Sequence, residues 1–424
     1  MKVDLLNQIV LRWDSDSDCA ALLKAGGIDV VWLQGSNERV APACQTAGAQ
    51  TLAAGDVRLV ALDQAGQLPP GAMAAVKTGV WPGARASARN ADGSVSAGAS
   101  QRAWVDANAY RVAWLKALYP EQLPVLGYLP DKDAGIPAGQ AIAYNSLELG
   151  LIDAWAAGGN YILAPDAAMR DALLGGNHAA MAAWSQMGRT ALWLKEHQPL
   201  FRQPPPGTIT VLVEPDETTA EIAALMYRQS ASPALVSAGR VPAPDAASRP
   251  IVVAAGIRPP SPAVRALLLS HAGAGATLVT DASGEGAWWR TPGLKRVRQF
   301  EDREFYALGA GRIVAYMDAV ADPGDFALDV LDLAGGSRPV RIWDCPAGIA
   351  LVSQAGPHAK PVLRVVNYGS PMRADIMAHV EGVFTAATLL RPGEQPAPLR
   401  TYRRGNHTEV MLPGLQRVAV VVFS

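Results

Sequence analysis

The stretch that most constrains the fold of this chain runs from Arg102 to Pro130. A short apolar run, 103–105, ends in Asp106, and a second apolar run, 125–129, ends at Pro130. Between the two runs, apolar residues at three- and four-residue spacings predict an amphipathic helix. Strand, helix and strand in this order form the repeating unit of an α/β barrel, whose active face is built at the carboxyl ends of the strands. We therefore expect Asp106 to lie on such a face.

The same alternation of apolar runs and helical patterns extends through the first half of the chain, with 30–33 among the predicted strands. A proline-rich segment, 204–207, then predicts a linker. We expect residues 1–203 to form a (β/α)8-type TIM barrel. Seven or eight strand–helix units would occupy these residues, whereas a complete barrel more often needs about 250. The predicted barrel is therefore compact or irregular.

Two further domains are expected after the linker. Between 207 and 335 all-apolar strands, such as 277–280, alternate with helices, which predicts a small doubly wound α/β domain. This segment contains neither GxGxxG nor a Walker motif nor a cysteine nucleophile, so we expect a structural or oligomerising role. In 338–424 the hydrophobic period changes to two, which predicts an antiparallel β-sandwich.

The charge pattern excludes some classes of partner. The net charge is −1, and acidic and basic residues are interleaved, so neither a nucleic-acid footprint nor a basic membrane patch is expected. No apolar run reaches the roughly 18 residues of a membrane span. The first residues lack the apolar core of a signal peptide. The location is left open: periplasmic or extracellular if a leader has been removed, otherwise cytoplasmic.

Cysteine and histidine positions predict no metal centre. The three cysteines (Cys19, Cys44 and Cys345) fit no zinc spacing, and the six histidines are scattered along the chain. We expect no metal and no cofactor. Cys19 and Cys44 fall on two predicted neighbouring helices, where either buried thiols or a disulfide would fit.

Several segments resemble the β-galactosidases of glycoside hydrolase clan A. TITVLVEPDETTAEIAALMYRQ, HAGAGATLVTDASG and REFYALGAGRIVAY resemble parts of their flavodoxin-like trimerisation domain, and VLRVVNYGSPMRADIMAHVEGVF resembles the β-sandwich that closes many glycosidases. The order of barrel, α/β domain and sandwich is also the same. The resemblance implies a glycoside hydrolase that acts on an oligosaccharide or polysaccharide. It also implies a homo-oligomer formed through the flavodoxin-like domain.

The catalytic glutamates of that clan are not matched. Clan A enzymes use one glutamate, usually after an asparagine, at the end of the fourth strand and another at the end of the seventh. The first 203 residues hold four glutamates, and only Glu38 follows an asparagine, in the loop after the second predicted strand. Either other carboxylates act, or the chain is a non-catalytic carbohydrate-binding or assembly protein on a degenerate glycosidase scaffold.

Three carboxylates are the candidate catalytic residues, because glycosyl transfer needs a pair of carboxyl groups flanking the bond. Asp106 is the best placed, although it could instead cap the helix that follows. Asp131 lies in a polar loop that a solvated turn explains equally well. Glu148 lies on a helix with an apolar face and could be an ordinary exposed helix residue.

A second set of residues is predicted to bind substrate, since sugar rings stack on aromatic side chains and bond to polar ones. These residues lie at or near predicted strand ends: Trp13, Asp14, Trp32, Gln34, Lys77, Trp81, Asn108, Tyr128 and Asn145. Core packing is the alternative for the aromatic residues. Lys77 is unusual within an apolar strand, and a buried lysine would need a partner such as Asp106. A barrel enzyme of another class, such as a lyase using Lys77, is a third interpretation.

Overall fold

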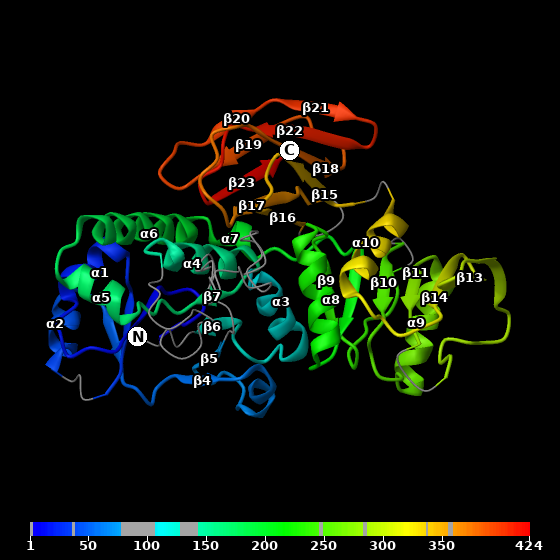
Figure 1. Ribbon diagram of the computed structural model, residues 1–424, viewed down its shortest axis with the longest axis horizontal. Helices are drawn as coiled ribbons and strands as arrows, with labels where there is room; N and C mark the ends of the chain where they lie inside the picture. Colours follow the sequence, from blue (N-terminus) through cyan, green and yellow to red (C-terminus); the bar gives the residue numbers. More distant parts are fainter. Residues whose placement is uncertain are drawn as a thin grey trace, which may run out of the picture.

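The computed structural model contains three modules (Figure 1). It describes residues 3–35, 39–77, 107–127, 143–245, 249–282, 286–335, 338–354 and 359–424. The first two modules combine helices with mainly parallel sheets, and the third is built from antiparallel sheets. The prediction of mixed α/β architecture followed by an antiparallel C-terminal region is therefore confirmed. In the described part of the chain, no helix is both long enough and apolar enough to cross a membrane.

The strands of the first module are all parallel where they pair. They are β1 (Val10–Trp13), β2 (Val30–Leu33), β3 (Gln50–Leu52), β4 (Arg58–Val60), β5 (Ala74–Lys77), β6 (Val125–Gly127) and β7 (Asn160–Tyr161). They form the sheets β1-β2-β3 and β4-β5-β6-β7, which one parallel bridge between Leu11 and Leu163 connects. The resulting strand order is β3-β2-β1-β7-β6-β5-β4. No pairing among the described residues closes these strands into a barrel, so the structure shows two connected parallel sheets.

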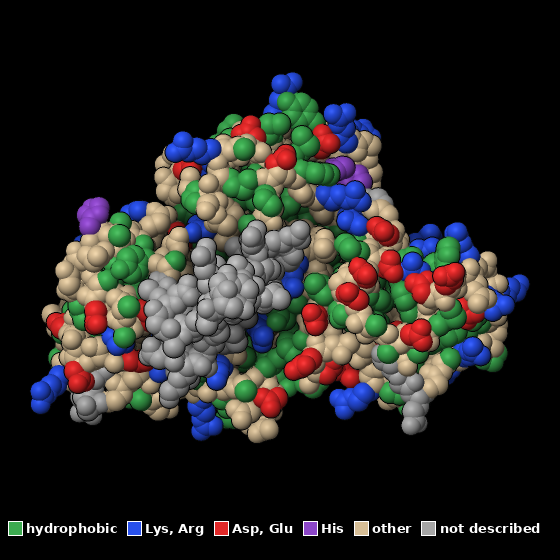
Figure 2. All heavy atoms as spheres, viewed as in Figure 1, with side chains coloured by type: hydrophobic (Ala, Val, Ile, Leu, Met, Phe, Trp, Pro, Cys, Tyr) green, Lys and Arg blue, Asp and Glu red, His purple; other side chains and the backbone are tan. Residues whose placement is uncertain are grey.

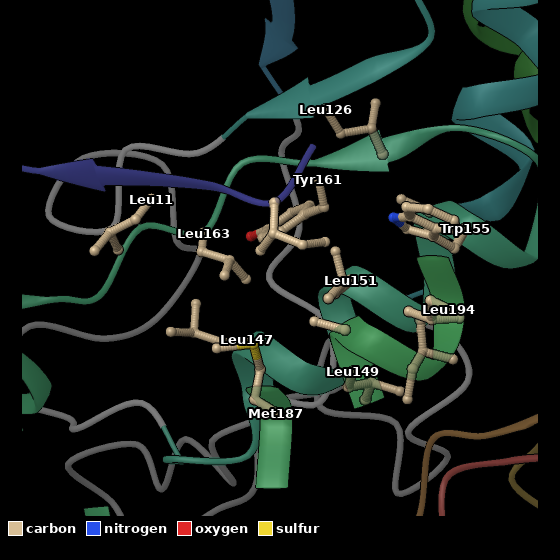
Figure 3. Packing of buried hydrophobic residues seen from close by; sticks show 14 of the residues in the cluster. Leu11, Leu126, Leu147, Leu149, Leu151, Trp155, Tyr161, Leu163, Met187 and Leu194 are labelled. Atoms are coloured by element: carbon tan, nitrogen blue, oxygen red, sulfur yellow. The ribbon is translucent and has the colours of Figure 1, made fainter. Parts of the chain in front are cut away.

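Helices cover one face of these sheets. They are α1 (Ala20–Gly26), α2 (Ala41–Thr46), the 3-10 helix η2 (Leu62–Gln67), α3 (Ala109–Leu118), α4 (Ser146–Ala156), α5 (Ala167–Leu174), α6 (His178–Glu196) and α7 (Gln198–Phe201). Figure 3 shows leucines of α4 lying between Tyr161 and Leu163 of the sheet and Met187 and Leu194 of α6. The helix α1 packs so closely on α6 that a Cβ at Gly188 would lie 2.0 Å from the carbonyl oxygen of Ala25.

Strand alternation separates two apolar clusters, because successive side chains point to opposite faces of a sheet. Leu11, Trp13 and Leu33 belong to the cluster that includes the helices. Val10, Trp32 and other alternate residues form a smaller cluster without helical members. We call the second side the helix-free face.

The second module contains a seven-stranded sheet with the order β12-β13-β14-β11-β10-β8-β9. Its elements are β8 (Ile209–Val213), α8 (Glu217–Arg228), β9 (Ala234–Ser237), β10 (Ile251–Ala254), α9 (Pro262–Ala274), β11 (Thr277–Thr280), β12 (Lys295–Gln299), β13 (Arg303–Leu308), β14 (Gly311–Tyr316) and α10 (Pro323–Ala334). The parallel part, β9-β8-β10-β11-β14, has the 2-1-3-4-5 order of flavodoxin-like sheets. The antiparallel hairpin β12-β13 extends it on one side.

The third module packs two antiparallel sheets around one core. The sheets are β15-β18-β22-β21 and β16-β17-β23-β19-β20. The strands are β15 (Val340–Trp343), β16 (Gly348–Ser353), β17 (Val362–Asn367), β18 (Ile376–Glu381), β19 (Ala387–Leu390), β20 (Ala397–Leu399), β21 (Thr401–Arg404), β22 (His407–Leu412) and β23 (Val418–Phe423).

Hydrogen bonds join the second and third modules. Ser230 and Ser232 follow α8 in the left-handed backbone region, with φ of 58° and 48°. Their hydroxyl oxygens accept from the backbone N–H groups of Ala350, at 3.0 Å, and Val352, at 2.8 Å, in β16. All four groups are buried, so these bonds satisfy backbone donors that water cannot reach.

Candidate functional site

Polar and aromatic side chains gather at the carboxyl edge of the first module's strands. All described strand pairs there are parallel, so the carboxyl ends of the strands lie at one edge. Trp32 belongs to the cluster on the helix-free face. The two-residue period places Arg12 and Asp14 on that face beyond Val10, and Gln34 beyond Trp32. We call Arg12, Asp14, Trp32, Gln34 and Lys77 the edge site.

Arg12 contacts two other members of the edge site, Asp14 and Trp32. Its Nε lies 3.1 Å from Oδ1 of Asp14, and its guanidinium carbon lies 5.4 Å from the centroid of the Trp32 ring. Arg12 and Trp32 are also directly paired across β1 and β2. Trp32 is only 3% exposed and its Nε1 lies 3.4 Å from the carbonyl oxygen of Ala54. Trp32 therefore orients Arg12 through a cation–π contact.

Arg12 was missed by the sequence predictions, although a signal for it was present. It is the one charged residue of the run Val10–Trp13. Because it lies two residues before Asp14, strand alternation places both side chains on the same face. A charged residue at the carboxyl end of a parallel strand is the kind of position from which barrel enzymes recruit functional groups.

Gln34 and Lys77 occupy the ends of β2 and β5. The backbone N–H of Gln34 donates to the carbonyl oxygen of Trp13 at 3.0 Å, and its side chain is half-buried. Lys77 is the last residue of β5 and is exposed. The expectation that Lys77 is buried within its strand is therefore wrong, because the strand ends there and the ammonium group can be hydrated.

Trp13 does not belong to the edge site. It points to the opposite face of β1, is fully buried among the helices, and its Nε1 donates to the carbonyl oxygen of Ser17 at 2.9 Å. Alternation along β1 places Trp13 and Arg12 on opposite faces, which favours core packing over the predicted role in substrate binding. Core packing explains this tryptophan.

Glu148 also lies elsewhere. It is 5% exposed on α4, and its Oε1 accepts from the hydroxyl of Thr190 at 2.6 Å and from Nε2 of Gln186 at 3.3 Å, both on α6. The carboxylate thus joins two helices. This position between two helices does not favour the predicted catalytic role of Glu148. The alternative that Glu148 is an ordinary exposed helix residue is wrong, because its side chain is buried.

The remaining predicted residues are placed as follows. Asn108 is 1% exposed at the start of α3, and Asn145 is exposed immediately before α4. Asp106, Asp131, Trp81 and Tyr128 lie outside the described residues.

A buried carboxylate that the sequence did not single out lies behind Asn108. Asp153 of α4 accepts from the backbone N–H groups of Asn108, at 2.6 Å, and Ala109, at 3.2 Å, at the amino end of α3. The hydroxyl of Tyr368, in the third module, donates to the same carboxylate at 2.5 Å. Burial raises the pKa of Asp153 to about 6, although these three donors act in the opposite direction. A carboxylate at a helix amino end is also favoured by the helix dipole.

The described residues contain no group of three or more His, Cys, Asp or Glu side chains arranged to hold a metal ion. Cys19 and Cys44 are both free and buried, with their sulfur atoms 3.6 Å apart. Cys345 is also free and buried.

Comparisons with known proteins show similarity in fold. Neither a model of a protein family nor a curated protein sequence matches this chain. An α-L-fucosidase isoenzyme 2 from Paenibacillus thiaminolyticus matches with a TM-score of 0.56 at 8% identity, over 99% of both chains. A β-galactosidase from Bacillus circulans sp. alkalophilus matches with a TM-score of 0.54 at 9% identity, over 93% of this chain and 63% of that one. A catalytic mutant of a GH42 β-galactosidase from G. stearothermophilus has a TM-score of 0.51 at 12% identity, over 91% and 66%. This chain thus resembles glycoside hydrolases in fold.

Proposed function

We propose that this protein is a glycoside hydrolase-like enzyme that acts on an oligosaccharide or polysaccharide at the carboxyl edge of a (β/α)8-type barrel. The observation that carries the proposal is the edge site, in which Arg12 holds Asp14 and stacks on Trp32. The similarity in fold to a fucosidase and to β-galactosidases supports it. On the face that Figure 2 shows, acidic and basic side chains of the described residues are interspersed.

The edge site offers the hydrogen-bonding groups that a sugar requires. A carboxylate accepts several hydrogen bonds, so Asp14 can bind Arg12 and still accept from a sugar hydroxyl. The guanidinium of Arg12, Gln34 and Lys77 supply donors on the same edge. We propose that these residues orient the substrate and that Trp32 positions Arg12.

Chemistry at this edge would require two carboxyl groups. We propose that Asp106 acts with one other carboxylate, for which Asp131 is a candidate, and that Trp81, Asn108, Tyr128 and Asn145 are further substrate-binding residues. Hydrolysis of a broad panel of glycosides and polysaccharides tests this assignment. Wild type should cleave at least one substrate, and Asp106→Asn should lower kcat by a factor of at least 100. Full activity of Asp106→Asn would remove Asp106 from the mechanism.

A non-catalytic carbohydrate-binding or assembly protein is the second candidate. It is favoured by the ion pair between Asp14 and Arg12, because Asp14 is the one carboxylate among the five residues of the edge site. Titration calorimetry with the same panel separates the two candidates. Saturable binding of a glycan that no preparation turns over would select this second function, whereas turnover would select the enzyme.

We also propose a separate role for each of the three modules. We propose that 1–203 carries the substrate site, that 207–335 is a flavodoxin-like domain that mediates self-association, and that 338–424 is a structural β-sandwich. Light scattering of the full chain tests the proposed self-association, and a monomeric mass at all concentrations would contradict it.

A further inference from the structure

A cavity of about 200 Å³ lies where the three modules meet. Its walls come from α3 and the end of α4, from α8 and β9, and from β16 and β17, which Figure 1 shows converging below the sandwich. This volume is far above the roughly 10–15 Å³ that one water molecule needs. Alanine, proline and leucine line much of it, and the polar lining includes Lys116, Gln203, Tyr227 and Arg364. The cavity can therefore hold a small molecule.

Arg364, on β17, is the most buried cation of this wall. It is 4% exposed, and its Nη1 donates to the carbonyl oxygen of Phe201 at 3.2 Å. Its buried Nε has no hydrogen-bond partner in the structure. Burial lowers the pKa of Arg364 to about 10. A buried charge costs free energy unless it is paired. A further hydrogen-bond acceptor beside Arg364 would therefore be stabilising.

Two further cations lie beside Arg364. A Cβ at Gly158 would lie 3.3 Å from Nζ of Lys116 and 3.0 Å from the Phe201 carbonyl oxygen that Arg364 binds. Arg202 donates to the carbonyl oxygen of Gly158 itself. Lys116, Arg202 and Arg364 thus surround one turn. Desolvation and the charges of both guanidinium groups lower the pKa of Lys116.

The described residues do not neutralise this cluster. Asp4 lies near Arg202 and raises its pKa, partly offsetting the effect of burial. Among the described carboxylates, none forms an ion pair with Lys116 or Arg364. Tyr227 adds a buried hydroxyl, and burial raises its pKa. Among the described residues, neither Arg364, which is buried, nor Lys116, which is exposed at the cavity mouth, has an acidic partner, and a doubly charged anion could bind both.

We propose that this cavity binds a small dianionic oxyanion, namely phosphate or a compact phosphate monoester. Arg364 and Lys116 are its charged ligands. A guanidinium offers parallel donors to phosphate oxygens, and an ammonium group adds a mobile point charge. Gln203 lines the same cavity, and the NH2 group of its side-chain amide is the part that could donate to a phosphate oxygen. Because every module contributes to the walls, the bound anion would stabilise their packing.

Titration calorimetry and thermal unfolding with inorganic phosphate, at constant ionic strength, test the proposal. We expect saturable binding and a rise in Tm for wild type. Lys116→Gln should weaken phosphate binding at least tenfold, and this variant should fold because Lys116 is exposed at the cavity mouth. Lys295→Gln, at an exposed lysine of β12, is the matched control and should bind as wild type does. Unchanged affinity in Lys116→Gln would overturn the proposal.

Two more probes define the ligand class. Glucose 6-phosphate binding more tightly than phosphate would support a monoester that fills the apolar wall, and equal binding would support recognition of the phosphate group alone. Malonate tests a dicarboxylate of similar charge. Binding of malonate without binding of phosphate, or no saturable binding of any probe at millimolar concentration, would refute the phosphate site.

Discussion

The hydroxyl of Tyr368 in the third module donates a 2.5 Å hydrogen bond to Oδ1 of Asp153 in the first. Both residues are almost completely buried. Asp153 also accepts from two backbone N–H groups at the start of α3, so one carboxylate ties a helix terminus, a second helix and the sandwich together. This contact is one of those that hold the sandwich against the first module, beside the apolar residues that the two share in one cluster.

Removing the hydroxyl of Tyr368 should destabilise the protein. A hydrogen bond to a charged group contributes about 1.5–3 kcal/mol, so we expect Tyr368→Phe to lower the free energy of unfolding by roughly that amount. Urea unfolding measures the change. Tyr402→Phe is the control, because Tyr402 is 43% exposed and its change should be within about 0.5 kcal/mol. Equal midpoints for wild type and Tyr368→Phe would contradict the prediction.

The raised pKa of Asp153 predicts a pH dependence of stability. Its folded pKa of about 6 exceeds the ordinary value of 3.8, so the folded state binds this proton more tightly than the unfolded state does. The resulting contribution is fully present below pH 3.8 and is lost as the pH rises through about 6, with a total of about 3 kcal/mol at most. Comparing wild type with Asp153→Asn from pH 4 to 7 isolates it. A constant difference across this window would contradict the assignment.

The edge site predicts separate effects for two carboxylates. Asp14→Asn should weaken glycan binding about tenfold or more, since it removes the ion pair with Arg12 and an acceptor for sugar hydroxyls. Glu148→Gln should leave binding unchanged, because Glu148 faces Thr190 on α6. Calorimetry with the best glycan measures both. Equal losses in the two variants would mean that the edge site is not where the sugar binds.

The arginine of the edge site can be tested by its own pair of variants. Arg12→Met keeps much of the side chain's length and packing on Trp32 but removes the charge, so we expect weaker binding with a modest loss of stability. Arg12→Lys keeps the charge without the planar group and should fall between Arg12→Met and wild type. Full binding by Arg12→Met would exclude a role for the guanidinium.

The cysteines should resist alkylation in the folded protein. All three are buried, and burial is the leading cause that raises the pKa of Cys19, Cys44 and Cys345, the last to about 11. Because the thiolate is the reactive form, iodoacetamide at pH 8 should modify them slowly until urea unfolds the chain. Mass spectrometry counts the adducts. Rapid modification of Cys19 under native conditions would show that its helix opens locally.

Close packing between α1 and α6 gives a further prediction. A methyl group at Gly188 would overlap the carbonyl group of Ala25, so Gly188→Ala should cost about 1–3 kcal/mol through displacement of the helices. Gly273→Ala, within α9, is the control because no atom lies within 4 Å of a Cβ there. Thermal unfolding compares the two variants, and an equal or larger loss at Gly273 would contradict this account of helix packing.

The sequence predicted the strands well where a continuous run of apolar residues forms the strand. The predicted strands 30–33 and 277–280 coincide with β2 and β11, because runs of apolar residues between helices are typical of buried parallel strands. The orientation of Trp13 also follows from alternation along β1, since Trp13 has the same parity as Leu11. Arg12 could have been found by the same alternation.

Other features depend on partners far away in the chain and could not be predicted. Asp153 lies in an apolar helix, and only the fold brings Tyr368 to it, 215 residues later. Glu148 likewise acquires its role from Thr190, across the helix interface. The short strands β20 and β21 carry proline and arginine rather than alternating apolar residues, so their pairing follows from neighbouring strands.

The two serine hydroxyls that bind β16 have a consequence for dissecting the protein. Removal of 338–424 would leave Ser230 and Ser232 in left-handed conformations without the N–H groups they accept from, and would expose the apolar wall beneath. The conformation of the turn after α8 therefore depends on contacts with a segment more than 100 residues later in the chain. Transplanting or expressing the second module alone would require resurfacing of the turn after α8, and the intact chain should unfold in a single cooperative transition.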